Sequence, residues 1–180
     1  MQKQIVVPIT VGGQPSQVTR FFNAASATVK GIEVEATIIP VDNFILRGTL
    51  GHQDGEYDEF VTPIPAGYDL STAPLDRLPD WSWAIDATYT IPVGRHKVVL
   101  NGNVNYEAEN LFTQSITSPD ENTFLNARTL VNASLTFAEE DDKYYLRLLG
   151  RNLTDKRYRT ASQVVGGLWA NSQYGAPEFY

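Results

Sequence analysis

The chain has 180 residues, 42% of them hydrophobic, with a formal net charge of −7 and no cysteine. This length is enough for one ordinary domain. The acidic balance argues against a nucleic-acid partner, because phosphates are neutralised by clustered lysine and arginine. The lack of cysteine excludes disulfide frameworks, thiolate metal sites and cysteine nucleophiles. No stretch approaches the ~18 consecutive apolar residues that indicate a transmembrane helix.

Period-two alternation of apolar and polar residues predicts long strands, because successive side chains of a strand point to opposite faces. In chain order the six expected strands are Thr28–Ile38, Asn43–Gln53, Trp81–Ile91, Lys97–Glu107, Arg128–Phe137 and Lys143–Asn152. Gln2–Val7 is similar to the tail of an earlier strand, and Ala176–Tyr180 to the start of an eighth. Strands in soluble proteins cluster near ~5–6 residues, whereas a tilted strand needs ~9–11 to cross a bilayer. The six predicted strands have the longer length.

Short and long connections alternate along the chain. The short ones contain turn formers around Pro40, Pro92 and Glu139–Asp142. The long ones, rich in glycine, proline, serine, asparagine and aspartate, are Thr10–Ala27, Asp54–Asp80, Ala108–Ala127 and Leu153–Gly175. Outer-membrane barrels have short periplasmic turns and long extracellular loops. The pattern therefore predicts an all-β fold, an antiparallel transmembrane β-barrel segment of about seven to eight up-and-down strands.

The alternation also assigns the two faces of the wall. Trp81 and Trp83 are expected at the outer membrane interface, and Phe137 and Tyr144 at the inner one, because amphipathic rings favour these depths. A charge on the lipid face costs ~2–4 kcal/mol at the midplane, so the charged faces should point into the lumen. The predicted lumen-facing residues are Glu33, Glu35, Arg47, Asp86, Asn101, Asn103, Asn105, Arg128, Asn132, Arg147 and Arg151.

Candidate ligand contacts lie in the long loops, since binding residues often sit on loops carried by a rigid scaffold. We predict exposed aromatic side chains for this role: Tyr57, Phe60, Tyr68, Phe112, Trp169 and Tyr174. Metal-chelate siderophores, cobalamin-like ligands and glycans could all use such rings, and the sequence does not choose between them.

No motif predicts catalysis, a metal or a cofactor. The sequence lacks Gly-x-Ser-x-Gly, a phosphate-cradling glycine loop and His-Glu-x-x-His. His52 and His96 fall at opposite ends of the predicted wall, so they cannot share a metal that needs converging ligands. The acidic cluster Asp54–Glu59 lacks the spacing of a calcium loop and is interpreted as a solvated loop start.

The segment Leu149–Tyr158, Leu-Gly-Arg-Asn-Leu-Thr-Asp-Lys-Arg-Tyr, resembles a signature near the C-terminus of TonB-dependent receptors. The matching motif residues are Asn152, Leu153, Thr154, Asp155, Lys156 and Tyr158. Gly175–Tyr180 resembles the family's entry into the final strand, with Glu178 where the family commonly has arginine. The resemblance implies that residues 1–180 are part of the receptor barrel, without the plug domain and the final strand.

The resemblance further implies uptake of a scarce small-molecule ligand across the bacterial outer membrane. Extracellular loops would capture the ligand, and an energy-coupled rearrangement of the plug would follow. The implied partners are outer-membrane lipid, the plug domain and the TonB complex; we expect no enzymatic activity. Two alternatives remain open: a soluble antiparallel β-sandwich or calycin-like binding module and, more weakly, an extracellular hydrolase on a β-scaffold.

Overall fold

The computed structural model describes residues 2–23, 26–62, 68–69, 71–113, 123–165, 169–175 and 178–179. All regular secondary structure in these ranges is β-strand. Among the same residues, no helix is long and apolar enough to cross a bilayer.

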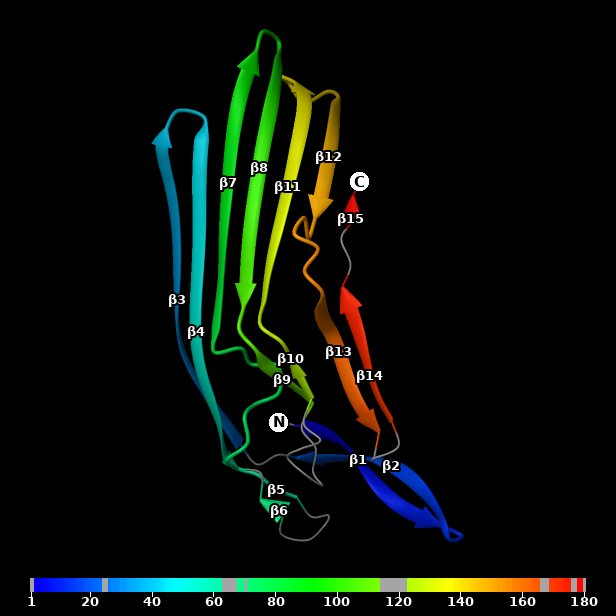
Figure 1. Ribbon diagram of the computed structural model, residues 1–180. Coiled ribbons are helices and arrows are strands. Elements are labelled where there is room, and N and C mark those ends of the chain that lie inside the picture. The colour runs from blue at the N-terminus through cyan, green and yellow to red at the C-terminus, as the bar shows by residue number, and fades with distance from the viewer. Residues whose placement is uncertain are drawn as a thin grey trace.

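The main body is one antiparallel seven-stranded sheet in which sequence neighbours lie side by side (Figure 1). Its order is β15-β12-β11-β8-β7-β4-β3. The strands are β3 (Ser26–Val41), β4 (Phe44–Glu59), β7 (Trp81–Val93), β8 (His96–Glu107), β11 (Arg128–Glu139), β12 (Tyr145–Arg151) and β15 (Glu178–Phe179). All six predicted strands are confirmed, and the predicted start of another strand pairs Glu178 and Phe179 with the end of β12.

The hairpins β3–β4, β7–β8 and β11–β12 all turn at one end of the sheet, which we call the turn end (Figure 1). Residues that tolerate the left-handed conformation lie in these turns: Asn43, Gly94 and Asp142 have φ of 63°, 61° and 56°. The N–H of Glu140 donates to the carbonyl of Arg95 at 3.0 Å, which joins two neighbouring turns. The predicted short connections are confirmed.

The opposite end, which we call the loop end, contains more strand than the sequence predicts (Figure 1). The expected loop Thr10–Ala27 is wrong, because most of it lies in hairpin strands. Four additional two-stranded pairs form: β1 (Gln2–Val11) with β2 (Gln14–Asn23), β5 (Val61–Thr62) with β6 (Tyr68–Asp69), β9 (Asn110–Thr113) with β10 (Thr123–Leu125), and β13 (Tyr158–Val165) with β14 (Trp169–Gly175).

The strands β3 and β4 also extend beyond their predicted ends. β3 and β4 each have 16 residues, and the ladder between them continues to Ser26 and Glu59. The acidic cluster Asp54–Glu59 is therefore part of β4, so the expectation of a loop start there is wrong, while its acidic side chains are exposed to solvent as expected. Extended pairing satisfies backbone groups that a loop would leave to water.

The apolar face of the main sheet is uncovered. Ile85, Leu100 and Leu146 retain 47%, 43% and 67% of their accessible surface. Buried apolar side chains gather instead at the loop end and include Tyr57, Phe60, Leu75, Leu111 and Leu125. In a sandwich the apolar face would be the core, so the described part of the chain lacks the second layer on which the soluble alternative depends.

Aromatic side chains of the apolar face form pairs at both ends of the sheet. Trp83 stacks on Tyr106 with centroids 5.6 Å apart toward the loop end. Phe137 stacks on His96 at 5.0 Å at the turn end, where His96 also lies 3.0 Å from the Tyr144 hydroxyl. The arrangement agrees with the aromatic bands expected at two membrane interfaces.

Candidate functional site

The strand register places the predicted lumen-facing residues on one face of the sheet. Arg47 pairs with Asp86, Asp86 with Asn103, and Asn103 with Asn132, so these four side chains form a row across four strands. Directly opposed residues of an antiparallel pair share a face. We call this face the polar wall; by pairing and alternation it also contains Glu33, Glu35, Asn101, Asn105, Glu107, Arg128, Arg147 and Arg151. Its exposure to a lumen stays a prediction.

Side-chain amides connect the middle of the polar wall. Asn101 Nδ2 donates to Asp86 Oδ2 at 2.8 Å and to Thr88 Oγ1 at 2.9 Å. Asn103 Oδ1 accepts from Asn105, and also from Asn132 Nδ2 at 3.2 Å. Since each amide has both donors and acceptors, the row satisfies many of its own polar groups before any ligand arrives.

Charged groups on the polar wall are only loosely screened from solvent. Arg47 Nη1 lies 3.9 Å from Asp86 Oδ1, with the arginine side chain 56% exposed. Arg147 Nε donates to Thr136 Oγ1 at 2.9 Å. An exposed pair of this kind contributes about 0–1 kcal/mol. Arg47 and Arg147 therefore remain accessible to an anion or to another protein surface.

Toward the loop end, Arg128 has a tighter environment. Its Nη2 lies 2.7 Å from Glu107 Oε2, and Asn110 Nδ2 donates to Glu107 Oε1 at 3.1 Å. The Arg128 guanidinium also lies 5.3 Å from the Tyr158 ring centroid. These contacts fix Arg128 as part of the framework at the loop end of the wall.

The motif Asn152–Tyr158 forms the turn that ends β12. Asn152 is 3% exposed and has φ of 50°. Its Oδ1 accepts from Lys156 N–H at 2.9 Å, while its Nδ2 donates to the Lys156 carbonyl at 3.0 Å. Asp155 N–H donates to the Asn152 carbonyl at 2.9 Å, and Leu153 and Thr154 are exposed. Asparagine suits this position because it tolerates the left-handed region and bonds to nearby backbone.

The predicted exposed aromatics divide into different groups. Tyr57 and Phe60 are 4% and 2% exposed, and their ring centroids lie 4.9 Å apart. The expectation that they are exposed is therefore wrong. Phe112 is half-buried beneath the Arg77 guanidinium, 4.5 Å from its ring centroid. Tyr174 is exposed beside Arg157, whose guanidinium lies 5.6 Å away. Tyr68 and Trp169 start β6 and β14, and their side chains lie outside the described part.

Sequence reasoning missed a set of buried apolar residues at the loop end, which we call the outer cluster. Tyr57, Phe60, Leu75, Leu111 and Leu125 are all buried there. A Cβ on Gly55 would overlap the Leu75 and Leu78 side chains, so glycine lets the returning segment approach β4. The available signal was the pair Leu75 and Leu78 within an otherwise polar stretch.

Backbone contacts reinforce this cluster. Arg77 N–H donates to the Leu111 carbonyl at 2.6 Å. Phe60 N–H donates to Ser71 Oγ at 2.8 Å, and Ser71 N–H donates to Asp69 Oδ1 at 2.8 Å. Hydrogen bonding from the Ser71 hydroxyl, and then from its N–H, holds the pKa of Asp69 below its usual value.

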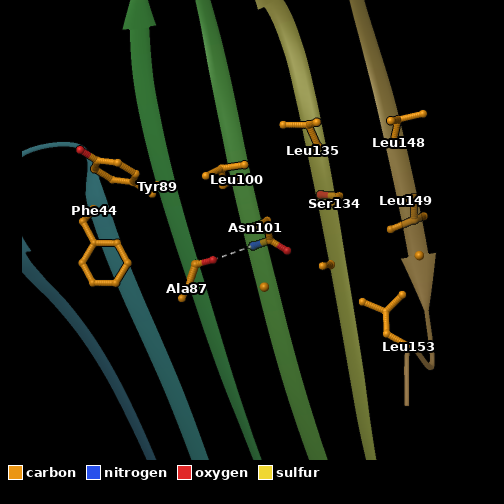
Figure 2. A pocket seen from close by; sticks show the side chains of 13 residues that line it. Phe44, Ala87, Tyr89, Leu100, Asn101, Ser134, Leu135, Leu148, Leu149 and Leu153 are labelled. Carbon is orange, nitrogen blue, oxygen red and sulfur yellow. Dashed lines mark hydrogen bonds between the residues drawn. The ribbon is translucent and has the colours of Figure 1, made fainter. Parts of the chain in front are cut away.

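A hollow of about 850 Å³ lies over the central strands (Figure 2). Its floor includes a cross-strand row of small residues, Ala87, Gly102, Ala133 and Gly150. The larger side chains beside that row are Tyr89, Leu100, Leu135 and Leu148, which belong to the apolar face. The small-residue row therefore lies on the face opposite the polar wall.

Metal binding finds no support in the described ranges. They contain no group of three or more histidine, cysteine or acidic side chains arranged to hold a metal ion. His52 stacks on Trp81 at 4.2 Å near the loop end, whereas His96 contacts Phe137 and Tyr144 at the turn end. The two histidines lie at opposite ends of the sheet, as predicted.

Comparisons with known proteins agree with this architecture. The family model described as TonB dependent receptor-like, beta-barrel, matches residues 2–153. Among solved structures the chain is similar to BauA, the ferric preacinetobactin receptor from Acinetobacter baumannii, with a TM-score of 0.60 and 18% identity. That match covers 99% of this chain and 25% of BauA, and at this identity it shows the fold alone. No curated protein matches.

Proposed function

Because the chain belongs to the family of TonB-dependent receptor β-barrels, we propose that it forms part of a receptor that carries a scarce ligand across the outer membrane. Its polar wall would line the lumen around a plug domain, and its loop end would face the medium. Energy for release into the periplasm would come from the TonB complex through the plug.

The observation that carries the proposal is the opposition of the two sheet faces. Asn101 belongs to the hydrogen-bonded wall, while its neighbour Leu100 retains 43% of its surface on the apolar face. Large exposed apolar surfaces on soluble monomers are rare, whereas a barrel buries such a surface in lipid.

The position of the aromatic pairs supports a membrane of ordinary outer-membrane thickness. The strand path from His96 to Tyr106 measures about 33 Å at ~3.3 Å per residue, and a tilt of ~40° reduces it to about 25 Å. An outer-membrane barrel has an apolar band ≈ 25 Å tall between its aromatic girdles. The two ends of β8 would therefore lie at the two interfaces.

For the ligand we favour an iron chelate over cobalamin and glycans. BauA, described as a ferric preacinetobactin receptor, motivates this order. Exposed Tyr174 beside Arg157 and the Arg77–Phe112 pair offer cationic and aromatic groups at the loop end. Anionic chelates favour such contacts, since guanidinium groups bind carboxylates and stack on rings.

Uptake and membrane insertion can be tested separately. We expect the intact protein to refold from urea only with micelles, and cells containing it to accumulate a radiolabelled ferric siderophore in a TonB-dependent manner. Labelled cobalamin and a labelled oligosaccharide serve as ligand controls. Monodisperse refolding in plain buffer would overturn the barrel, whereas uptake of a control ligand alone would overturn the iron-chelate assignment.

A further inference from the structure

The hairpin β13–β14 at the loop end is attached to β11 at two points. Both attachments use polar-wall side chains, Asn132 and Arg128, which lie four positions apart and so share a face. Two residues of the wall thus help to fix the outer hairpin, which is also hydrogen-bonded to β10 at Thr123 and Phe124.

The first attachment is a relay of asparagines. Asn132 Oδ1 accepts a hydrogen bond from the backbone N–H of Asn152 at 3.0 Å. The Asn152 side chain then holds both backbone groups of Lys156, which lies just before β13. Leu153 N–H adds a bond to the Val131 carbonyl at 2.8 Å. The turn between β12 and β13 therefore rests directly on β11.

The second attachment is the Tyr158 ring. Tyr158 pairs with Gly175 across the hairpin, and a Cβ on Gly175 would overlap that ring. The Arg128 guanidinium lies 5.3 Å from the same ring, and Arg128 is in turn held by Glu107 at 2.7 Å. A ring packed between a glycine backbone and a fixed cation restricts the base of the hairpin.

Asn132 is the member of this arrangement with two separate tasks. Its Oδ1 holds Asn152 at the loop end, while its Nδ2 donates to Asn103 Oδ1 in the middle of the wall at 3.2 Å. Moving the amide to improve one contact changes the other, because both atoms belong to one planar group.

We propose that Asn132 couples the hydrogen bonding of the polar wall to the mobility of the β13–β14 hairpin. This rests on the proposed function, in which the wall faces a plug domain in the lumen. A lumenal group that bonds to Asn103 or Asn132 would weaken the Asn152 contact and loosen the hairpin. The state of the lumen would thus be transmitted to the outer surface through one amide.

A spin label on the hairpin measures this coupling directly. The chain contains no cysteine, so Gln173→Cys provides one attachment site, at an exposed position of β14. In the intact protein in micelles, we expect Asn132→Ala to shorten the rotational correlation time of the label about twofold, as for a segment released to local motion. The matched control Asn101→Ala removes an amide that bonds to Asp86 and Thr88, and should leave the spectrum unchanged.

Two further variants separate anchoring from coupling. Asn132→Asp keeps an oxygen that accepts from Asn152 but removes the donor to Asn103 Oδ1, so the label should become more mobile than in the unmodified protein. Asn103→Ala removes the wall contact of Asn132, together with the contacts of Asn103 to Asn105 and Ile85, and keeps the Asn132 amide itself, so the label should again become more mobile. An unchanged spectrum in Asn103→Ala, or equal spectra for Asn132→Ala and Asn101→Ala, would overturn the proposal. The measurement needs no ligand, so a failed uptake assay leaves its result unaffected.

Discussion

Individual aromatic residues at the loop end have two distinct environments. Tyr57 and Tyr174 both lie in stretches that were predicted as long polar loops. The structure buries Tyr57 against Phe60, and leaves Tyr174 exposed beside Arg157. Leu75 and Leu78 return to Gly55, two positions before Tyr57, and that return is a long-range contact without a local signature. The presence of a tyrosine therefore predicts an aromatic contact at the loop end, but it does not predict whether the ring is buried in the protein or exposed to a ligand.

We expect Tyr57→Ala to destabilise the outer cluster by about 3–5 kcal/mol, the usual cost of removing a buried aromatic ring. Protease cleavage between residues 71 and 80 should accelerate accordingly, and mass spectrometry of limited digests measures it. Tyr174→Ala is the control, and should leave cleavage there unchanged while weakening ligand binding. Equal cleavage in the two variants would show that Tyr57 does not hold this segment in place.

At the scale of strands, period-two patterning predicts the membrane-spanning elements well, because lipid on one side and polar groups on the other impose the alternation. The patterns at Trp81–Ile91 and Lys97–Glu107 therefore reproduce β7 and β8 closely. The outer hairpins follow a different rule. Neither β1–β2 nor β13–β14 belongs to the main sheet, so the alternation that its two faces impose is not required of them and their pairing depends on the turn and on neighbours. Gly12–Gly13, with φ of 59° and 80°, was the usable turn signal that the sequence interpretation overlooked.

The β3–β4 ladder offers a test of close backbone approach. A Cβ on Gly31 would lie 2.6 Å from the His52 carbonyl oxygen, whereas a Cβ on Gly102 would meet nothing within 4 Å. Gly31→Ala should therefore cost about 1–3 kcal/mol, because the backbone must shift. Gly102→Ala should change stability little. Urea unfolding in micelles compares the two, and an equally stable Gly31→Ala protein would contradict the described register.

At the scale of the whole molecule, the main sheet has one apolar face and one polar face. The environment of each face determines which substitutions it tolerates. The apolar face has no protein layer over it within the described ranges, while the polar wall is internally hydrogen-bonded. Which side chains lie on the apolar face and which on the polar wall could be predicted from the alternation and from the cost of a charge in lipid. The asparagine relay at Asn132 could not be predicted, because it depends on the register of three strands and on the burial of Asn152 at the start of a turn.

The adjacent residues Leu100 and Asn101 test this assignment of faces. Leu100→Arg should destabilise the protein by ~2–4 kcal/mol, the cost of a cation near the bilayer midplane. Asn101→Arg places the same charge beside Asp86 on the polar wall and should cost much less. Folded yield in lipid vesicles, measured by the shift of the unheated band on a gel, distinguishes them. A better yield for Leu100→Arg would mean that the two faces are reversed.

The outermost strand of the main sheet, β3, is hydrogen-bonded to β4 alone in the order of the sheet. Over 16 residues its other edge offers backbone donors and acceptors to any extended peptide, including another copy of itself. During biogenesis this edge is where misassembly and fibrillar aggregation would begin. Pairing of β3 with a neighbouring barrel strand would remove this template.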